Sequence, residues 1–197
     1  MLGVVGLVVG GIWIAATAVR QRTLINELEV TLSHGVDYFR QNPLAAAPTP
    51  AGASYELTPL GSLLNAAGLV SGIFQYNSGV DGLVGGGLAV NFAVFSNGDS
   101  HATCAGCKIL AVAVGFAADD SLSALIPKPE ICSAVTNLFL QSSVDIQGGS
   151  DYGLQLLNAD ASVAGTWDPE SGDPKPSFSD FGSWCQTAVT VTAYYGR

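Results

Sequence analysis

Four cysteines carry the most reactive side chains of this 197-residue chain, and their spacing limits the chemistry open to them. Cys104 and Cys107 form a C-x-x-C pair, a spacing used for redox dithiols and for half of a metal site. Cys132 and Cys185 stand apart from them. An even number of cysteines beside an export-type N-terminal segment is typical of disulfides in an oxidising compartment, and three pairings are possible. We therefore expect two structural disulfides.

The two histidines give a metal or redox centre little support. His101 extends the pair to H-x-x-C-x-x-C, but the other histidine, His34, lies far away near the N-terminus. The sequence has no second C-x-x-C, and a haem attachment would need histidine at position 108, where Lys108 stands. We interpret His101 as a turn or cap residue and expect neither a metal nor a cofactor.

An acidic segment is the other feature that resembles a site. Asp168, Glu170 and Asp173 follow one another closely, and Asp180 comes shortly after them. Carboxylate oxygens are the ligands that Ca²⁺ prefers, although the spacing does not match an EF-hand loop. We interpret the segment as a solvated acidic turn on the exterior and keep Asp168, Glu170 and Asp173 as a calcium candidate.

The sequence lacks the common catalytic motifs. It has no G-x-S-x-G elbow, no P-loop, no G-x-G-x-x-G after a strand and no H-E-x-x-H. Gly85, Gly86 and Gly87 precede a predicted strand rather than a helix, so they do not form a phosphate cradle. The formal net charge of −9 argues against non-specific binding of nucleic acid. We expect a protein that is not an enzyme.

The element most specific to this chain is its N-terminal segment. Residues 2–19 carry no charge, and a polar, periodic stretch follows without a break until Asn42-Pro43. The apolar positions of that stretch are Leu24, Leu28, Leu32, Val36 and Phe39. Spacings of three and four residues predict one helix over residues 1–42, roughly 60 Å long. We expect residues 1–25 to be a membrane anchor or filament core and residues 26–42 to be the amphipathic half.

Three roles compete for the uncharged half. A secretory signal peptide would need a basic stretch before the apolar run, which is absent here. A plain single-pass anchor would place Arg20 and Arg22 at the membrane interface. A fibre spine would pack identical helices together through Leu2, Val5, Leu7, Val9, Ile12, Trp13 and Ile14. Gly3, Gly6, Gly10 and Gly11 lower the helix propensity of this half. We therefore expect the helix to melt locally in the assembled state, around residues 6–12.

Residues 43–197 are predicted to form one disulfide-tied α+β head. Its strands are expected at residues 88–95, 135–146 and 187–195, with a short strand near 73–76. Its helices are expected after Thr58-Pro59, at 104–114 and at 178–186. Loops are expected over 69–86, 119–131 and 147–177. Only 12% of all residues are charged, which suits a subunit that covers much of its surface with copies of itself.

A long N-terminal helix, a strand at residues 88–95, a helix with Cys107, and a short helix with Cys185 before a last strand together resemble a type IV pilin. The order is most similar to the type IVb branch, which includes the toxin-coregulated pilin and bundlin. The resemblance implies a long helix packed on a small antiparallel sheet, and a structural subunit of a pilus filament on the bacterial surface. It also implies that Cys107 pairs with Cys185, which leaves Cys104 for Cys132.

The resemblance further implies the partners. These are copies of the same chain in a helical polymer, the inner membrane before assembly, the pilus assembly machinery and a prepilin peptidase. The family carries a glutamate near the start of the mature helix, whereas Val5 stands at the fifth position here and the first carboxylate is Glu27. We expect the printed sequence to begin inside the mature helix, and the alternative is that the usual glutamate is absent. The alternatives to a pilus subunit are a type II secretion pseudopilin and a membrane-anchored monomeric periplasmic domain.

Overall fold

The computed structural model describes residues 2–42, 57–70, 72–95, 109–119, 122–141, 153–169 and 172–196. Within these ranges, side chains are described for all residues except 2–18, 57–59, 95 and 196. The helices are α1 (Leu2–Gln41), α2 (Gly61–Ala66), α3 (Pro129–Gln141) and α4 (Phe178–Trp184). The strands are β1 (Leu57–Pro59), β2 (Gln75–Asn77), β3 (Gly82–Gly85), β4 (Leu88–Phe95), β5 (Ile109–Phe116), β6 (Leu154–Asn158), β7 (Val163–Trp167) and β8 (Ala188–Gly196).

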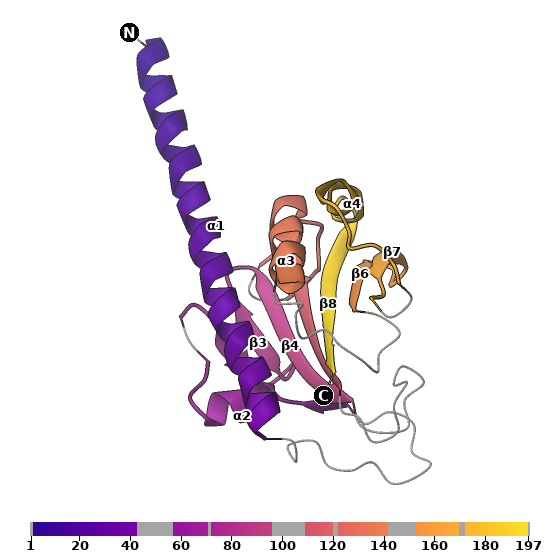
Figure 1. The fold of residues 1–197 in the computed structure, drawn as a ribbon. Helices are drawn as coiled ribbons and strands as arrows, with labels where there is room; N and C mark the ends of the chain where they lie inside the picture. The colour runs from indigo at the N-terminus through magenta and orange to yellow at the C-terminus, as the bar shows by residue number, and fades with distance from the viewer. Residues whose placement is uncertain are drawn as a thin grey trace.

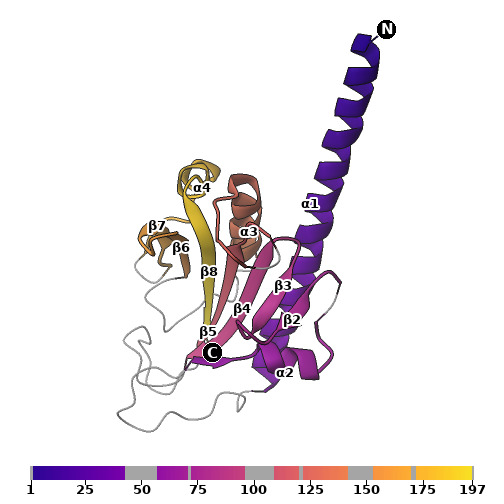
Figure 2. The same ribbon diagram turned by 180° about the vertical axis from the view of Figure 1, so that it is seen from behind.

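The strands form one antiparallel sheet in the order β2-β3-β4-β5-β8-β6-β7, and β1 pairs with β4 beside this path. Helices α1, α3 and α4 lie side by side on one face of it (Figures 1 and 2). The chain is therefore an α+β protein with an N-terminal helix packed on an antiparallel sheet. Among the described residues, the core fills the layer between this face and the three helices.

The register explains which side chains face the helices. Phe92 of β4 lies opposite Val112 of β5, which in turn lies opposite Ala193 of β8. Because alternate residues of a strand point to the same face, the large buried side chains of the central strands share the helix side of the sheet. The residues between them are mostly small or polar, such as Ala113 and Thr192. The sheet thus has a bulky inner face and a small-residue outer face.

The prediction of a helix over residues 104–114 is wrong from Ile109 onward, because Ile109–Phe116 form a central strand. Residues 101–108 lie outside the described residues. Strand β5 pairs with β4 and β8, and every residue of it except Ala113 is buried. A strand covered on both faces shows no alternation of polar and apolar residues, so its pattern cannot be distinguished from that of a buried helix.

The opposite error occurs in α3. The predicted strand over residues 135–146 is wrong for residues 135–141, which belong to a helix that begins at Pro129, and residues 142–146 lie outside the described residues. The buried positions are Cys132, Val135, Thr136, Phe139 and Leu140, which is the spacing of one helical face. Pro129 suits the first turn, where its missing N–H would have no helical partner.

Two predicted loops contain strands. The loop over residues 147–177 contains the hairpin of β6 and β7, and β6 pairs with β8. Leu154 and Leu156 are buried in it, so the expectation of a loop is wrong for residues 154–158 and 163–167. The loop over residues 69–86 contains β3 and all of β2, and β2 overlaps the short strand expected near residues 73–76. In each case the strands are held by pairing with neighbouring strands, which the local sequence pattern does not indicate.

The helix predicted to begin at Thr58-Pro59 starts later. Those two residues form part of β1, opposite Val94 and Ala93 of β4, and α2 begins at Gly61. The backbone N–H of Leu60 donates to the carbonyl of Phe92, 2.9 Å away, which extends this pairing to the edge of the helix.

Four other predictions of elements are confirmed. The strand over Leu88–Phe95 has the predicted bounds, and α4 and β8 lie where a short helix and a last strand were expected. The N-terminal helix ends at Gln41, one residue before the predicted break. Figure 1 shows that its N-terminal part projects beyond the other elements, whereas its C-terminal part lies along the sheet.

Candidate functional site

The second half of α1 is fixed to the sheet by a narrow stripe of side chains. Leu24, Leu28, Leu32 and Phe39 are each at most 7% exposed, and they repeat at helical spacing. Leu24 is the first residue of the core cluster along the chain among the described side chains. The docked part of the helix therefore begins near residue 24.

Gly35 sets how closely the helix approaches the sheet. A Cβ atom at this position would overlap the aromatic ring of Phe92 on β4. Phe92 is 1% exposed and lies in the same core cluster as Leu32 and Phe39. The absence of a side chain at Gly35 lets the Phe92 ring pack directly against the helix backbone, so α1 lies close to the sheet at this point.

A tight turn supports the helix at its point of departure. Gly86 and Gly87 join β3 to β4, and both have positive φ, 61° and 73°. This is the backbone of a two-residue type I′ hairpin turn, which favours glycine at both positions. Gly86 lies against the side chains of Leu24 and Ile73, because a Cβ atom here would approach both of them. The glycine run is therefore a turn that contacts α1, in agreement with its assignment before a strand.

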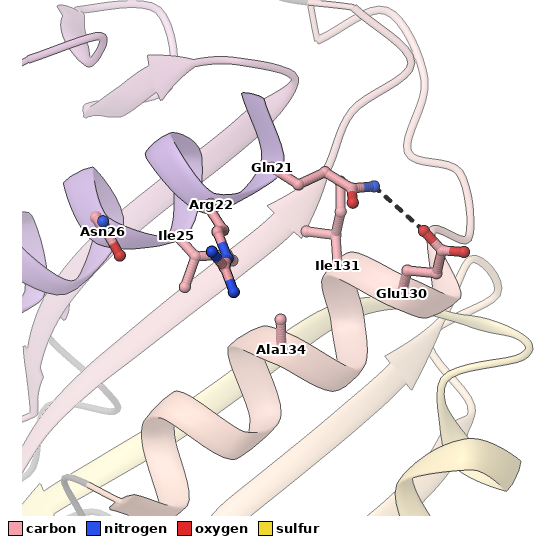
Figure 3. Close-up of a pocket in the computed structure, with 7 residues that line it drawn as sticks. All are labelled: Gln21, Arg22, Ile25, Asn26, Glu130, Ile131 and Ala134. Atoms are coloured by element: carbon pink, nitrogen blue, oxygen red, sulfur yellow. Dashed lines mark hydrogen bonds between the residues drawn. The ribbon is translucent and has the colours of Figure 1, made fainter. Parts of the chain in front are cut away.

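Two cavities flank α1 where it leaves the sheet. The α1–α3 cavity has a volume of about 370 Å³ and lies between Ile25 of α1 and Ile131 and Ala134 of α3. Figure 3 shows Gln21 reaching across its end to Glu130, with Nε2 donating to the carboxylate at 3.2 Å. The turn cavity, of about 440 Å³, is lined by Val19, Leu24, Ile73, Gly86 and Ile131 among others.

The rim of these cavities combines apolar surface with positive charge. Val19 is 63% exposed and Ile73 is 41% exposed. Arg20 lines the turn cavity and Arg22 lines the α1–α3 cavity, and both arginines are exposed. An apolar hollow beside a projecting helix is an arrangement suited to receiving another protein surface.

A disulfide joins Cys132 to Cys185, with their Cα atoms 5.6 Å apart. This bridge corrects the predicted pairing of Cys107 with Cys185 and of Cys104 with Cys132, since each of those pairs assigns one of these two sulfurs elsewhere. The physical reason is the exchange of two elements. Residues 109–116 form a strand rather than a helix, and the helix that brings a cysteine to Cys185 is α3.

The bridge ties α3 to the C-terminal cap of α4 across 53 residues of sequence. Both cysteines are fully buried, and the hydroxyl of Thr136 lies 3.9 Å from the Cys185 sulfur. A structural disulfide is therefore present, as expected, but it joins Cys185 to Cys132 rather than to Cys107. Cys104, Cys107 and His101 lie outside the described residues, so the C-x-x-C stays untested.

The calcium candidate of Asp168, Glu170 and Asp173 stays untested, because Glu170 lies outside the described residues. Within the described ranges, the structure contains no group of three or more His, Cys, Asp or Glu side chains that could hold a metal ion. The Asp173 carbonyl accepts a hydrogen bond from the Trp167 indole at 3.2 Å, and Asp180 caps α4.

The capping contact has an electrostatic consequence. One carboxylate oxygen of Asp180 accepts hydrogen bonds from the backbone N–H and the hydroxyl of Ser177, each at 2.7 Å. The backbone bond, followed by the hydroxyl bond, holds the pKa of Asp180 below its ordinary value because both favour the charged form. Asp180 is thus an exposed, ionised carboxylate at neutral pH.

His34 has a structural contact. Its Nδ1 lies 3.0 Å from the carbonyl oxygen of Leu69, which connects α1 to the segment after α2. The predicted assembly residues, from Leu2 to Ile14, and the predicted melting glycines lie in the helical backbone of α1, but their side chains are outside the described set. Local melting concerns the assembled state and stays a prediction.

Phe178 was not among the residues predicted from the sequence, and at 77% it is the most exposed of the large apolar side chains whose surroundings are described. It begins α4 and makes an edge-to-face contact with Phe181, with ring centroids 6.1 Å apart. Phe181 contacts Trp184 at the same centroid distance. The spacing of three residues between these aromatics was the available signal, but it does not reveal which ring faces solvent.

Comparison with known proteins gave no match to a family model, to a curated protein or to a solved structure. Within the part of the chain whose side chains are described, which excludes residues 2–18, no helix is long and apolar enough to cross a membrane.

Proposed function

We propose that this protein is the structural subunit of a filament of the type IV pilus kind, most similar to the type IVb branch, on a bacterial surface. Copies would assemble through the N-terminal part of α1, which would reside in the inner membrane before assembly. The observation that carries the proposal is the division of one helix into two halves. The half from Leu24 to Phe39 is docked on the sheet, and the other projects beyond it (Figure 1).

The sequence of the projecting half supports the assignment of assembly to this half and of docking to the other. Residues 2–18 include no charged residue, and an isolated helix without charges would be a poor choice for a surface left in water. Packing against identical helices would bury it, and Gly3, Gly6 and Gly10 would permit close approach. The docked half would then transmit this contact to the head through Gly35 and Phe92.

Removal of the projecting half tests the proposal. Because the docked stripe starts at Leu24, a chain that begins at Val19 keeps every described α1 contact with the sheet. Material sheared from cells and viewed by electron microscopy should contain filaments for the full chain and none for this truncation. A matched control replaces Ser33, an exposed residue of the docked half, with alanine and should leave filaments unchanged.

Two results would contradict the proposal. Filaments formed by the truncated chain would show that the projecting half does not hold the fibre. A full chain that stays monomeric in the membrane fraction, with no filament outside the cell, would favour the membrane-anchored domain instead.

A further inference from the structure

The exposure of Phe178 is not explained by a role in holding α4. That helix is already held by three other contacts: Phe181 is 3% exposed in the core, the Trp184 ring covers Gly165 of β7, and Cys185 is bridged to Cys132. Phe178 makes an edge-to-face contact with this group, and 77% of it remains accessible. A large aromatic side chain left in water is a common anchor of protein interfaces.

The turn cavity offers a complementary shape on the same molecule. It is mostly apolar, with Val19, Leu24 and Ile73 on its walls, and its volume is about 440 Å³. An apolar cavity of about 150 Å³ is enough to hold benzene, so this hollow is large enough for a phenyl ring. Val19 and Ile73, like Phe178, expose apolar surface that a contact would cover.

The two features lie on different flanks of the molecule. In both views α3 stands between α1 and α4 (Figures 1 and 2). The turn cavity has residues of α1 in its lining, whereas Phe178 begins α4, so α3 separates the two features within one chain. With Phe178 as a knob on one flank and the turn cavity as a hollow on the other, a contact between the two joins copies head to tail. Such a contact leaves a free knob and a free hollow at the ends, and it builds an open polymer when the rotation does not close.

Charge is complementary across the same contact. Asp180 lies two residues after Phe178 and is exposed and ionised, whereas Arg20 lines the turn cavity and Arg22 is exposed two residues further along α1. Glu130, an acidic residue near this rim, accepts the hydrogen bond from Gln21. Lys175, a cation near α4, donates to the Leu140 carbonyl at 2.9 Å. Asp180 beside Phe178 and Arg20 in the turn cavity thus form one pair of opposite charges, and Glu130 and Lys175 are each held by a neighbour in their own chain.

We propose that Phe178 of one copy inserts into the turn cavity of a second copy, with Asp180 placed beside Arg20. This inference rests on the proposed filament, and it adds the side contact that fixes neighbouring heads. The occupant of the cavity is therefore a residue of the same protein, contributed by the next subunit.

A photo-crosslinking amino acid in place of Phe178, in the full chain, tests the contact directly. Illumination of filaments should produce covalent dimers and higher ladders, and the crosslinked peptide should contain Val19, Ile73 or Ile131. The same probe at Val163, which is 55% exposed on β7, is the control and should not reach that peptide. Filaments whose crosslinks from position 178 lie elsewhere would overturn the inference and leave the proposed function intact.

Substitution gives a second, quantitative measure. Phe178→Asp should raise the protein concentration needed for filament formation by about tenfold or more, as expected for the loss of an interface anchor. Val163→Asp should change it by less than about twofold. Asp180→Arg and Arg20→Asp should each weaken assembly, and the double variant should recover part of the loss.

The outcomes separate the two proposals. Equal effects of Phe178→Asp and Val163→Asp, with filaments still formed by both, would exclude the knob while keeping the filament. If the unaltered chain forms no filament at all, both proposals fail.

Discussion

At the scale of single residues, some glycines lie so close to a neighbouring side chain that no larger residue fits without a shift. Gly35 is one of them, because an added methyl group would overlap the Phe92 ring. We expect Gly35→Ala to lower the free energy of unfolding by about 1–3 kcal/mol, as for other overpacked cores. Urea unfolding followed by tryptophan fluorescence measures this.

The matched control is Ser33→Ala, on the exposed side of the same helix, which should change stability by less than about 0.5 kcal/mol. A second variant isolates the cause: Phe92→Leu, which shortens the obstructing side chain, should reduce the cost of Gly35→Ala when the two are combined. Equal costs in both backgrounds would show that the clash is not with Phe92.

Asp160 provides a residue-scale prediction about pH. In the turn between β6 and β7, its Oδ1 accepts bonds from the Ser162 hydroxyl at 2.6 Å and from the Ser162 N–H at 3.0 Å. The hydroxyl bond first, and then the N–H bond, lower the pKa of Asp160. A lowered pKa in the folded state stabilises the fold above the unfolded value of about 3.9, and this contribution is lost as the pH falls through the folded value.

The stability difference between the unaltered protein and Asp160→Asn should therefore be constant near neutral pH and shrink below about pH 4. Thermal melts from pH 2 to 7 measure it. In a Ser162→Ala background the pH dependence due to Asp160 should be smaller, because the hydroxyl bond is its largest cause. A difference that grows as the pH falls would contradict the assignment.

At the scale of elements, the disulfide between Cys132 and Cys185 links α3 to α4. A closed loop of 53 residues restricts the unfolded chain by about 4 kcal/mol in the loop-entropy estimate. We expect Cys132→Ala with Cys185→Ala to lose stability of that order. Peptide mapping without reduction should recover the two cysteine peptides as one linked species.

The control for this prediction is a variant with alanine at both Cys104 and Cys107. The Cys132–Cys185 peptide should persist in it, because neither replaced cysteine takes part in the bridge. A map in which Cys185 is linked to Cys107 would restore the pairing implied by the pilin resemblance and contradict this structure.

The elements also show where sequence patterns stop being informative. Strand β4 is predictable with its bounds because turn-rich segments flank it on each side. Strand β5 and helix α3 are exchanged in the prediction: β5 is buried on both faces, and the valine and threonine of α3 favour a strand although its buried positions repeat at helical spacing. The wrong disulfide pairing follows from that exchange.

The candidate site was predictable only in part. The uncharged half of α1 and its stripe from Leu24 to Phe39 are visible in the sequence because they are periodic. The turn cavity is not, because it unites α1 with Ile73 and Ile131, residues that are distant in the chain and meet only in the folded protein. The exposure of Phe178 depends in the same way on which neighbours fill the core.

At the scale of the whole molecule, the head should be independent of the projecting half of α1. The described core cluster begins at Leu24, so a chain that starts at Val19 should unfold cooperatively. A chain that starts at Ser33 loses the buried side chains of Leu24, Leu28 and Leu32, each worth about 2–5 kcal/mol, and should not fold stably.

Circular dichroism melts of the two truncated chains measure this difference. The chain that starts at Val19 serves as the control for the one that starts at Ser33, since both lack the uncharged segment. Cooperative melting of both chains at one temperature would mean that the docked half contributes little to the fold.

The position of β8 has a consequence for chains that end before it. Residues 188–196 are the last strand along the sequence, yet β8 lies between β5 and β6 in the interior of the sheet. Before residues 188–196 join the sheet, β5 has an unpaired edge and the β6–β7 hairpin has no neighbour to join. Exposed strand edges invite pairing with other chains. A chain cut short before residue 188 should therefore aggregate more readily than a chain that contains β8, and light scattering of the two at equal concentration measures the difference.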